Sequence, residues 1–300
     1  MRRVGVVEHE SSDGVRGHVA GCMLVVGVHV GVNFGPDAMR YLYAGKGVPV
    51  PRPFNLRWLL PTICRTEPVR WWIVWAVSWP LLAGSMVWWR VVAGDDWKVA
   101  AASAALLVGL PGILGPTVSI PIQVDLPATA LVVFGCAVTQ YSMIAGIGVF
   151  ALAAMMRETA PVVAALWLWS LWPLLALFPV IVAAILIRPG ADPMGGELQR
   201  IADHPIRTAL EYHAGRWRDG WLMVAPWGIC LAGLYGADWR LLTVIAVAYL
   251  QLLVATDTVR LVQHVAGVPL AIAAATVVPT NWLVLAVVAH IVWWRQPERI

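Results

Sequence analysis

Residues 34–61, FGPDAMRYLYAGKGVPVPRPFNLRWLLP, form a polar, aromatic and basic segment that separates two apolar runs of the chain. Pro36 suits the first position of a helix, and Asp37 just inside it favours the positive end of the helix dipole. At helical spacing the residues that follow have one apolar and one polar face, which predicts an amphipathic helix on a membrane surface. The apolar face holds Ala38, Met39, Leu42 and Tyr43, and the polar face holds Asp37, Arg40 and Tyr41.

The composition of the chain predicts a membrane protein. Hydrophobic residues make up 60% of the 300 residues and charged residues 13%, whereas soluble domains average roughly 25% charged residues. We therefore expect an all-α integral membrane protein with about 8–10 transmembrane helices of roughly 20 residues each. Residues 1–300 are expected to form a single polytopic membrane domain, with a first large loop at 35–69 that carries amphipathic surface helices and a second polar loop at 188–219.

The basic residues indicate an orientation and a set of partners. Arg2, Arg3 and Arg16 precede the first apolar run, residues 19–34, and positive charge favours the cytoplasmic side. We expect a multi-pass protein of the cytoplasmic membrane with its N-terminus inside. The net charge of +4 comes from basic residues scattered beside apolar runs, which favours membrane lipids as partners and argues against nucleic acid.

Apolar runs and the breaks between them predict the remaining helices. The polar residues 139–142, TQYS, favour two short helices over one long tilted helix in the run 127–156. Trp172-Pro173 predicts two shorter helices or a sharp kink in the run 160–187, because proline breaks or kinks a helix. Helical periodicity predicts a surface helix at 197–210. Further spans are expected at residues 70–92, 99–114, 220–236, 240–255, 259–277 and 280–294.

The sequence carries no signature of a soluble enzyme, such as a Walker loop, GxSxG or HExxH. This argues against ATP-driven transport by the chain alone. Three of the 4 cysteines lie in apolar runs without a CxxC pair, so we expect no metal site and no cofactor, and no ligand set supports a divalent metal. The candidates are therefore charged residues at the edges of apolar runs. Arg157 and Glu158, between two such runs, are expected to pair with each other or to mark the water boundary.

Asp37 is the candidate catalytic residue. A carboxylate at this position can act as a general base on an acceptor hydroxyl or help a glycosyl phosphate to leave. Its alternative role is a favourable charge at the start of a helix. Arg52 and Arg57 are candidates for binding the phosphate or pyrophosphate of a substrate through their planar guanidinium groups, with lipid headgroup binding as the alternative.

A second set of polar residues is expected to line a cavity. Asp257, Arg260 and His264 follow i, i+3, i+7 spacing on one helical face, although an ion pair at the membrane boundary explains Asp257 and Arg260 as well. Asp125 follows a proline-rich loop, and helix capping near Pro127 is its alternative role. The candidate cavity-lining residues are Arg40, Tyr41, Asp125, Asp257, Arg260 and His264.

The order of these features resembles the GT-C superfamily of polytopic membrane glycosyltransferases, which use polyprenyl-phosphate-linked sugars. The resemblance rests on five short segments spread over most of the chain. They are PDAMRYLYAG (36–45), PFNLRWLLP (53–61), VDLPATAL (124–131), RETAPVVAALWL (157–168) and ATDTVRLVQHVAGVPL (255–270). The chain would be a short member that lacks the C-terminal soluble domain, with one acid instead of an acidic pair in residues 34–61.

The resemblance implies roles for particular residues. Members of the superfamily place a catalytic carboxylate in the first extracytoplasmic loop, and that role falls on Asp37. Their loop arginines bind lipid phosphate, and this role falls on Arg52 and Arg57. The expected activity is transfer of a sugar from a polyprenyl-phosphate donor to a lipid, glycan or protein acceptor. The alternatives are a non-enzymatic transporter or lipid-handling protein, whose charges would line a translocation path, and a catalytically inactive membrane partner.

The first large loop gives two opposite indications of its location. It is the most basic part of the chain, and the positive-inside rule alone would place it in the cytoplasm. The resemblance places it outside the cytoplasm, where phosphate binding would give its charges a purpose. We adopt the second location as the expectation. The basic residues concerned are Arg40, Lys46, Arg52, Arg57, Arg65 and Arg70.

Overall fold

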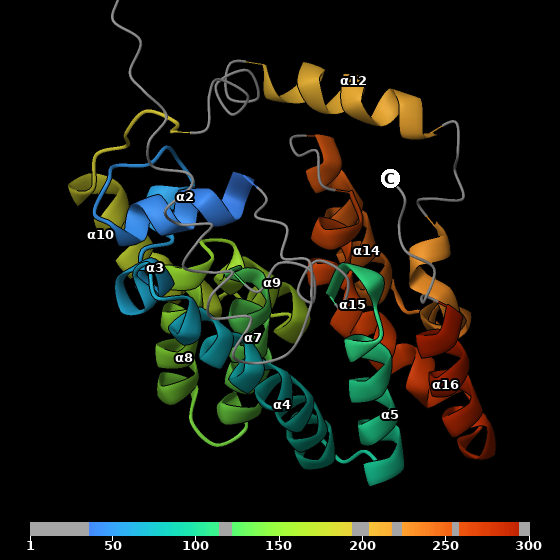
Figure 1. The fold of residues 1–300 in the computed structure, drawn as a ribbon. Helices are drawn as coiled ribbons and strands as arrows, with labels where there is room; N and C mark the ends of the chain where they lie inside the picture. Colours follow the sequence, from blue (N-terminus) through green and yellow to red (C-terminus); the bar gives the residue numbers. More distant parts are fainter. Residues whose placement is uncertain (1–35, 114–121, 194–203, 218–223, 254–257, 294–300) are drawn as a thin grey trace, which may run out of the picture.

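The computed structural model describes residues 36–113, 122–193, 204–217, 224–253 and 258–293 (Figure 1). Every regular element in these ranges is a helix, which confirms the all-α prediction. The first apolar run, residues 19–34, lies outside the described residues. The number of membrane spans stays a prediction, because many of the described helices are shorter than the roughly 20 residues that a bilayer requires.

Residues 36–64 fold into a small unit of short helices. Helix α2, Pro36–Gly45, forms where a helix was predicted, but Arg40 and Tyr41 of its predicted polar face are each 3% exposed, because they pair with other parts of the chain. It is followed by η1, Phe54–Leu56, and α3, Leu59–Cys64. Tyr41 of α2 packs against the ring of Phe54 with centroids 5.3 Å apart. These elements share a hydrophobic core that is separate from the core of the longer helices.

Helix α4, Pro68–Val92, leads away from this unit as a single helix of 25 residues with Pro80 inside it. In the part of the chain that the structure describes, α4 is the one helix whose length and apolar composition would allow it to cross a membrane, and 28% of its apolar stretch is buried within the protein. A turn then reverses the chain into α5, Trp97–Val108, where the side chain of Asp96 accepts a hydrogen bond from the backbone N–H of Lys98.

The two predicted helix breaks are confirmed. The run 127–156 forms α7, Asp125–Thr139, and α8, Met143–Met156, as an antiparallel pair. The run 160–187 forms α9, Ala160–Leu168, η2, Trp172–Leu177, and α10, Phe178–Leu186. The first break falls at the predicted polar cluster, where the side chain of Ser142 accepts from the backbone N–H of Ala145 and caps α8. The second falls at residues 169–171, directly before Trp172-Pro173; the ring of Pro173 lacks the N–H that a continuing helix requires.

The predicted surface helix at 197–210 is described only from residue 204 onward, and there the chain forms α12, Pro205–Trp217. Pro205 favours a helix that starts at its own position and disfavours helical geometry at the residue before it. Residues 194–203 lie outside the described part of the chain.

The C-terminal third contains shorter and more irregular elements than predicted. Gly228 takes a φ of 49°, and this kink interrupts η3, Ala225–Gly236. The other elements are α14, Trp239–Leu250, η4, Gln251–Leu253, α15, Thr258–Val277, η5, Thr280–Trp282, and α16, Leu283–Trp293. Helix α15 packs against α5, α14 and η3, so it lies in the interior of this half.

A buried glutamine joins two of the irregular segments. Gln263 of α15 is 1% exposed. Its Oε1 atom accepts from the backbone N–H of Gly112 at 2.6 Å, and its Nε2 atom donates to the carbonyl of Pro226 at 2.7 Å. One side chain thus pairs with backbone groups of two segments that are distant in sequence.

Replacement of this glutamine should therefore destabilise the fold. We expect Gln263→Leu to lower the free energy of unfolding by about 2–4 kcal/mol, because both buried backbone groups lose their partner. Thermal or chemical unfolding of the purified protein measures the change. Gln140→Leu, at an exposed position in the α7–α8 turn, is the matched control and should have little effect. A Gln263→Leu variant as stable as the unchanged chain would contradict the role given to this side chain.

Candidate functional site

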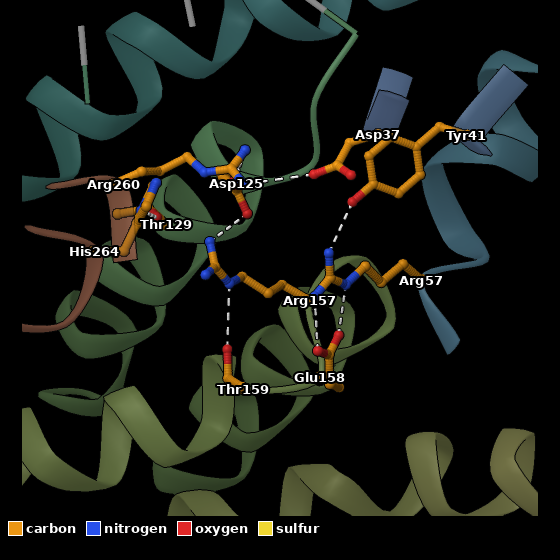
Figure 2. Close-up of polar contacts among 10 residues, drawn as sticks. All are labelled: Asp37, Tyr41, Arg57, Asp125, Thr129, Arg157, Glu158, Thr159, Arg260 and His264. Carbon is orange, nitrogen blue, oxygen red and sulfur yellow. Dashed lines mark hydrogen bonds and ion pairs between the residues drawn. The ribbon is translucent and has the colours of Figure 1, made fainter. Parts of the chain in front are cut away.

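Arginines and carboxylates from six parts of the chain meet near the starts of α7, α9 and α15, and Figure 2 shows most of them. Because α7 runs from this point to the Ser142 turn and α8 returns, the meeting point lies at the end of the α7–α8 pair that is opposite that turn. We call this group the arginine–carboxylate cluster. Its members are Asp37, Arg40, Arg57, Asp125, Arg157, Glu158, Asp192 and Arg260.

Asp125 lies at the centre of the cluster. Its side chain is 7% exposed, its Oδ1 atom is paired with Arg157, and its Oδ2 atom lies 3.2 Å from Nη1 of Arg260. The structure does not support the alternative role of Asp125 as a helix cap, because no side chain makes a capping hydrogen bond at the start of α7. Asp125 instead connects α7 to the α8–α9 link and to α15.

Arg157 and Glu158 are adjacent in sequence but pair with different partners. Arg157 binds Asp125 and also donates from Nε to Oγ1 of Thr159 at 3.3 Å. Glu158 accepts two hydrogen bonds from Arg57, at 2.7 and 2.8 Å. The expectation that Arg157 and Glu158 pair with each other was therefore wrong: each one pairs with a distant part of the chain.

The pair of Arg57 and Glu158 extends to α2. Nη1 of Arg57 donates to the hydroxyl of Tyr41 at 2.9 Å (Figure 2). Burial raises the pKa of Tyr41 to about 12, although the guanidinium of Arg57 acts in the opposite direction. Burial alone would raise the pKa of Glu158 as well, but the charge and hydrogen bonds of Arg57 outweigh it and lower that pKa below its ordinary value. Tyr41 is thus a neutral hydroxyl, and Glu158 a carboxylate, at neutral pH.

Asp37 occupies the outer edge of the cluster. Its Oδ1 atom accepts from Nη1 of Arg40 at 3.1 Å, and its Oδ2 atom lies 3.5 Å from Nη2 of Arg260. The side chain of Asp37 is 37% exposed, compared with 7% for Asp125 and 21% for Glu158. Asp37 is therefore the most accessible carboxylate of the cluster.

Arg40 fixes the helix that carries Asp37. Besides its contact with Asp37, it makes two hydrogen bonds to Asp192, at 3.0 and 2.8 Å. The side chains of Arg40 and Asp192 are 4% and 7% exposed. A bidentate pair of this kind sets both distance and orientation, so it holds α2 against the segment that follows α10.

The structure separates the two arginines that were predicted to bind phosphate. Arg57 is inside the cluster, where its donors are directed to Glu158 and Tyr41. Arg52 is exposed, and its Nη2 atom donates to the carbonyl of Ala184 at 3.2 Å. Arg52 therefore lies outside the cluster.

The other predicted site residues divide in a similar way. Arg40, Tyr41, Asp125 and Arg260 belong to the cluster or contact it, whereas Asp257 lies outside the described residues. Sequence reasoning gave no site role to Arg157, Glu158 or Asp192. The signal for the first two was the segment RETAP between two apolar runs, and Asp192 was one acid among several in the second polar loop.

A small cavity adjoins the cluster between α7, α9 and α15. Its volume is about 20 Å³, which exceeds the roughly 10–15 Å³ that one water molecule requires. Arg157, Thr159 and His264 contribute polar groups to its lining, and Val132 and Trp167 contribute apolar ones. His264 thus lines this cavity. Its Nδ1 atom is 2.7 Å from Oγ1 of Thr129, and its buried Nε2 atom has no hydrogen-bond partner.

The donor and acceptor groups define what this region can do chemically. Within the described ranges, no three His, Cys, Asp or Glu side chains are grouped so that they could hold a metal ion. The carboxylates of the cluster face arginines instead. The arrangement places an accessible carboxylate, Asp37, beside the guanidinium of Arg260. The carboxylate can act as a base, and the guanidinium can bind an anion.

Comparisons with known proteins give no match to this chain. No protein-family model, no curated protein and no solved structure matches it.

The pair of Arg57 and Glu158 should contribute measurably to stability. We expect Glu158→Gln to lower the free energy of unfolding by about 1–3 kcal/mol, because a largely buried guanidinium loses its counter-charge. Since the pKa of Glu158 is lowered in the folded protein, this contribution is present above the unfolded glutamate pKa, about 4.3. It is lost as the pH falls through the folded value.

Unfolding curves of the two proteins between pH 4 and 8 measure this difference. Glu211→Gln is the matched control, because Glu211 pairs with Arg207 on the exposed face of α12 and such pairs contribute little. An equal effect of the two substitutions would contradict the assigned importance of Glu158.

Proposed function

We propose that this chain is a membrane glycosyltransferase that moves a sugar from a polyprenyl-phosphate-linked donor to a lipid, glycan or protein acceptor. The observation that carries the proposal is the position of Asp37. It is an accessible carboxylate at the edge of a largely buried set of ion pairs, and it lies next to a guanidinium group. The resemblance to the GT-C superfamily assigns the catalytic carboxylate to the same residue.

The exposed side chains support a membrane location. Large apolar residues lie on the outside of α4, α8, α10, α14 and α16, where contact with water would be unfavourable and contact with lipid tails would not. Few charged residues lie along these helices. The residues include Ile73, Val77, Ile144, Leu152, Phe178, Ile181, Ile185, Leu242, Leu250, Val284, Leu285 and Val288.

The proposed reaction uses Asp37 as the general base. The oxygen of the acceptor hydroxyl attacks the anomeric carbon of the sugar, and the bond from that carbon to the phosphate oxygen breaks. Asp37 takes the proton of the hydroxyl, and polyprenyl phosphate leaves with the bonding electrons. Arg260, which faces Asp37 at 3.5 Å, is better placed than Arg52 to stabilise the negative charge on the leaving phosphate. Asp125 positions Arg260 through their ion pair.

Substitution of Asp37 tests this role. We expect Asp37→Asn to reduce formation of the glycosylated product by at least about 100-fold, since general bases contribute 10²–10⁴ in rate. Mass spectrometry of lipids and surface glycans, from cells with and without the protein, identifies the product and measures its amount. Asp95→Asn is the matched control, because Asp95 forms an ion pair with Arg90 at the far end of α4. Unchanged product in the Asp37→Asn strain, at equal expression, would refute the assignment.

The proposed orientation places the first large loop outside the cytoplasm. Thr66 is exposed between α3 and α4, and a cysteine there can be labelled without disturbing the cluster. We expect a membrane-impermeant maleimide to label Cys22→Ser/Thr66→Cys in intact cells and not to label the Cys22→Ser chain, whose remaining cysteines, Cys64, Cys136 and Cys230, are buried. Labelling only after permeabilisation would place this loop in the cytoplasm and contradict the proposed orientation.

A second candidate function is a transporter or lipid-handling protein. The observation that favours it is the buried side chain of Gln263, which joins Gly112 to Pro226 of the kinked segment η3. Broken helices with buried polar groups also occur on translocation paths. The glycan and lipid analysis separates the two functions. A transporter would change the distribution of a lipid or solute without creating a new glycosidic bond.

A further inference from the structure

Exposed basic residues lie at the C-terminal ends of α2, α3 and α10, at the start of α4 and in the loop before η1. They differ from the arginines of the cluster, which are largely buried and paired. We call this surface the basic face. Its charged residues are Lys46, Arg52, Arg65, Arg70 and Arg188, and all five are exposed.

Backbone contacts make the basic face one packed surface. The backbone N–H of Gly190 donates to the carbonyl of Val50 at 3.0 Å. On the same side, Nδ2 of Asn55 donates to the carbonyl of Ile187 at 3.3 Å, and Arg52 reaches the carbonyl of Ala184. These bonds join the end of α10 to the loop that follows α2. The basic residues on either side are therefore presented together.

The loop also packs closely against the end of α3. A Cβ atom added to Gly45 would lie 2.8 Å from the backbone of Arg65, so α2 and the α3–α4 link are in direct contact. The guanidinium of Arg70 donates to the carbonyl of Ile63 at 3.0 Å. The basic face therefore continues from the α10 side to the beginning of α4.

The charge of the basic face is not neutralised by neighbouring residues. No ion pair connects any of its five basic side chains to another described residue. Within residues 46–70, Glu67 is the one acid, and it too is exposed without an ion pair of its own. The surface therefore carries an excess of positive charge that faces outward.

Exposed aliphatic residues lie among these charges. Val48, Ile63 and Val69 are 41%, 50% and 54% exposed, and Ile185 and Leu186 at the end of α10 are more exposed still. A surface that binds only soluble anions gains nothing from exposed aliphatic side chains. Basic residues interleaved with aliphatic ones are the pattern of a surface at the lipid headgroup layer, where the charges meet phosphates and the aliphatic groups enter the acyl boundary.

We infer that the basic face binds the headgroup layer of an anionic membrane, with lipid phosphates at its five basic residues. This contact fixes α2 at the depth of the headgroups and leaves the edge of the arginine–carboxylate cluster beside the lipid surface. The inference concerns lipid binding alone and does not depend on sugar transfer.

The test uses the purified full chain in neutral detergent, titrated with phosphatidylglycerol or with phosphatidylcholine of the same chain length. The thermal unfolding midpoint reports binding, because a ligand that binds the folded state raises it. We expect phosphatidylglycerol to raise the midpoint at a lower concentration than phosphatidylcholine, and high salt to weaken the effect. Inorganic phosphate at the same concentrations should not reproduce it.

Two variants with equal loss of charge locate the binding surface. Arg65→Gln/Arg70→Gln should weaken the response to phosphatidylglycerol by roughly 25-fold, at about fivefold for each basic residue removed. Lys98→Gln/Arg240→Gln removes two exposed charges outside the basic face and should leave the response unchanged. The comparison is made on the lipid-dependent shift of each protein, so a change in basal stability does not affect it.

Three results would overturn the inference. They are equal responses to the two lipids, an equal response to inorganic phosphate, and equal loss of response in the two double variants. Because the lipid titration has no catalytic readout, failure of the Asp37→Asn experiment and failure of this one are separate results.

Discussion

The rest of the structure depends on the position of Asp125 between two arginines. Its carboxylate is 7% exposed and pairs with Arg157 and Arg260. A buried charge is tolerated only when it is paired, and removal of one partner leaves the others uncompensated. These ion pairs tie the start of α7 to the α8–α9 link and to α15, which are distant in sequence. Because an unpaired buried charge is costly, these ion pairs disfavour any packing that separates their partners.

The same interaction determines the surroundings of Asp37. Arg260 pairs with Asp125 through Nη1 and faces Asp37 through Nη2. Arg57 and Glu158 hold Tyr41 from the other side of α2, and Asp192 holds Arg40. Helix α2 is therefore fixed by polar contacts from three parts of the chain. Its accessible carboxylate is held in a defined orientation although it lies at the edge of the cluster.

The sequence was sufficient to predict local structure. Pro36 and the periodicity after it predicted α2, and the polar residues 139–142 and Trp172-Pro173 predicted the breaks in two apolar runs. These features act within one or two turns, so the sequence reports them directly. The start of α12 at Pro205 follows the same local rule, because proline suits the first position of a helix.

Pairing across the fold was not predictable from the sequence. Arg57 and Glu158 are 101 residues apart, and Arg260 and Asp37 are 223 apart. Arg52 and Arg57 looked equivalent in one loop, but Arg57 follows the 3₁₀ turn of η1 and enters the cluster, whereas Arg52 remains exposed. Nothing local in a single sequence distinguishes the two, because the difference arises from the position of Glu158. The sequence thus identified Asp37, Arg57, Asp125 and Arg260 as candidate site residues, but it did not predict which side chains they pair with.

The division of the arginines into two groups explains why the first large loop is so basic. Arg40 and Arg57 are neutralised inside the fold by Asp192 and Glu158, so they present little charge to a membrane. Of the exposed basic residues, Lys46 directly follows the C-terminal end of α2, and Arg65 lies against Gly45 at that same end, whereas Asp37 lies in the first turn of the helix. The first large loop thus contributes both arginines whose charge is paired inside the fold and basic residues whose charge is exposed. Burial separates the two groups.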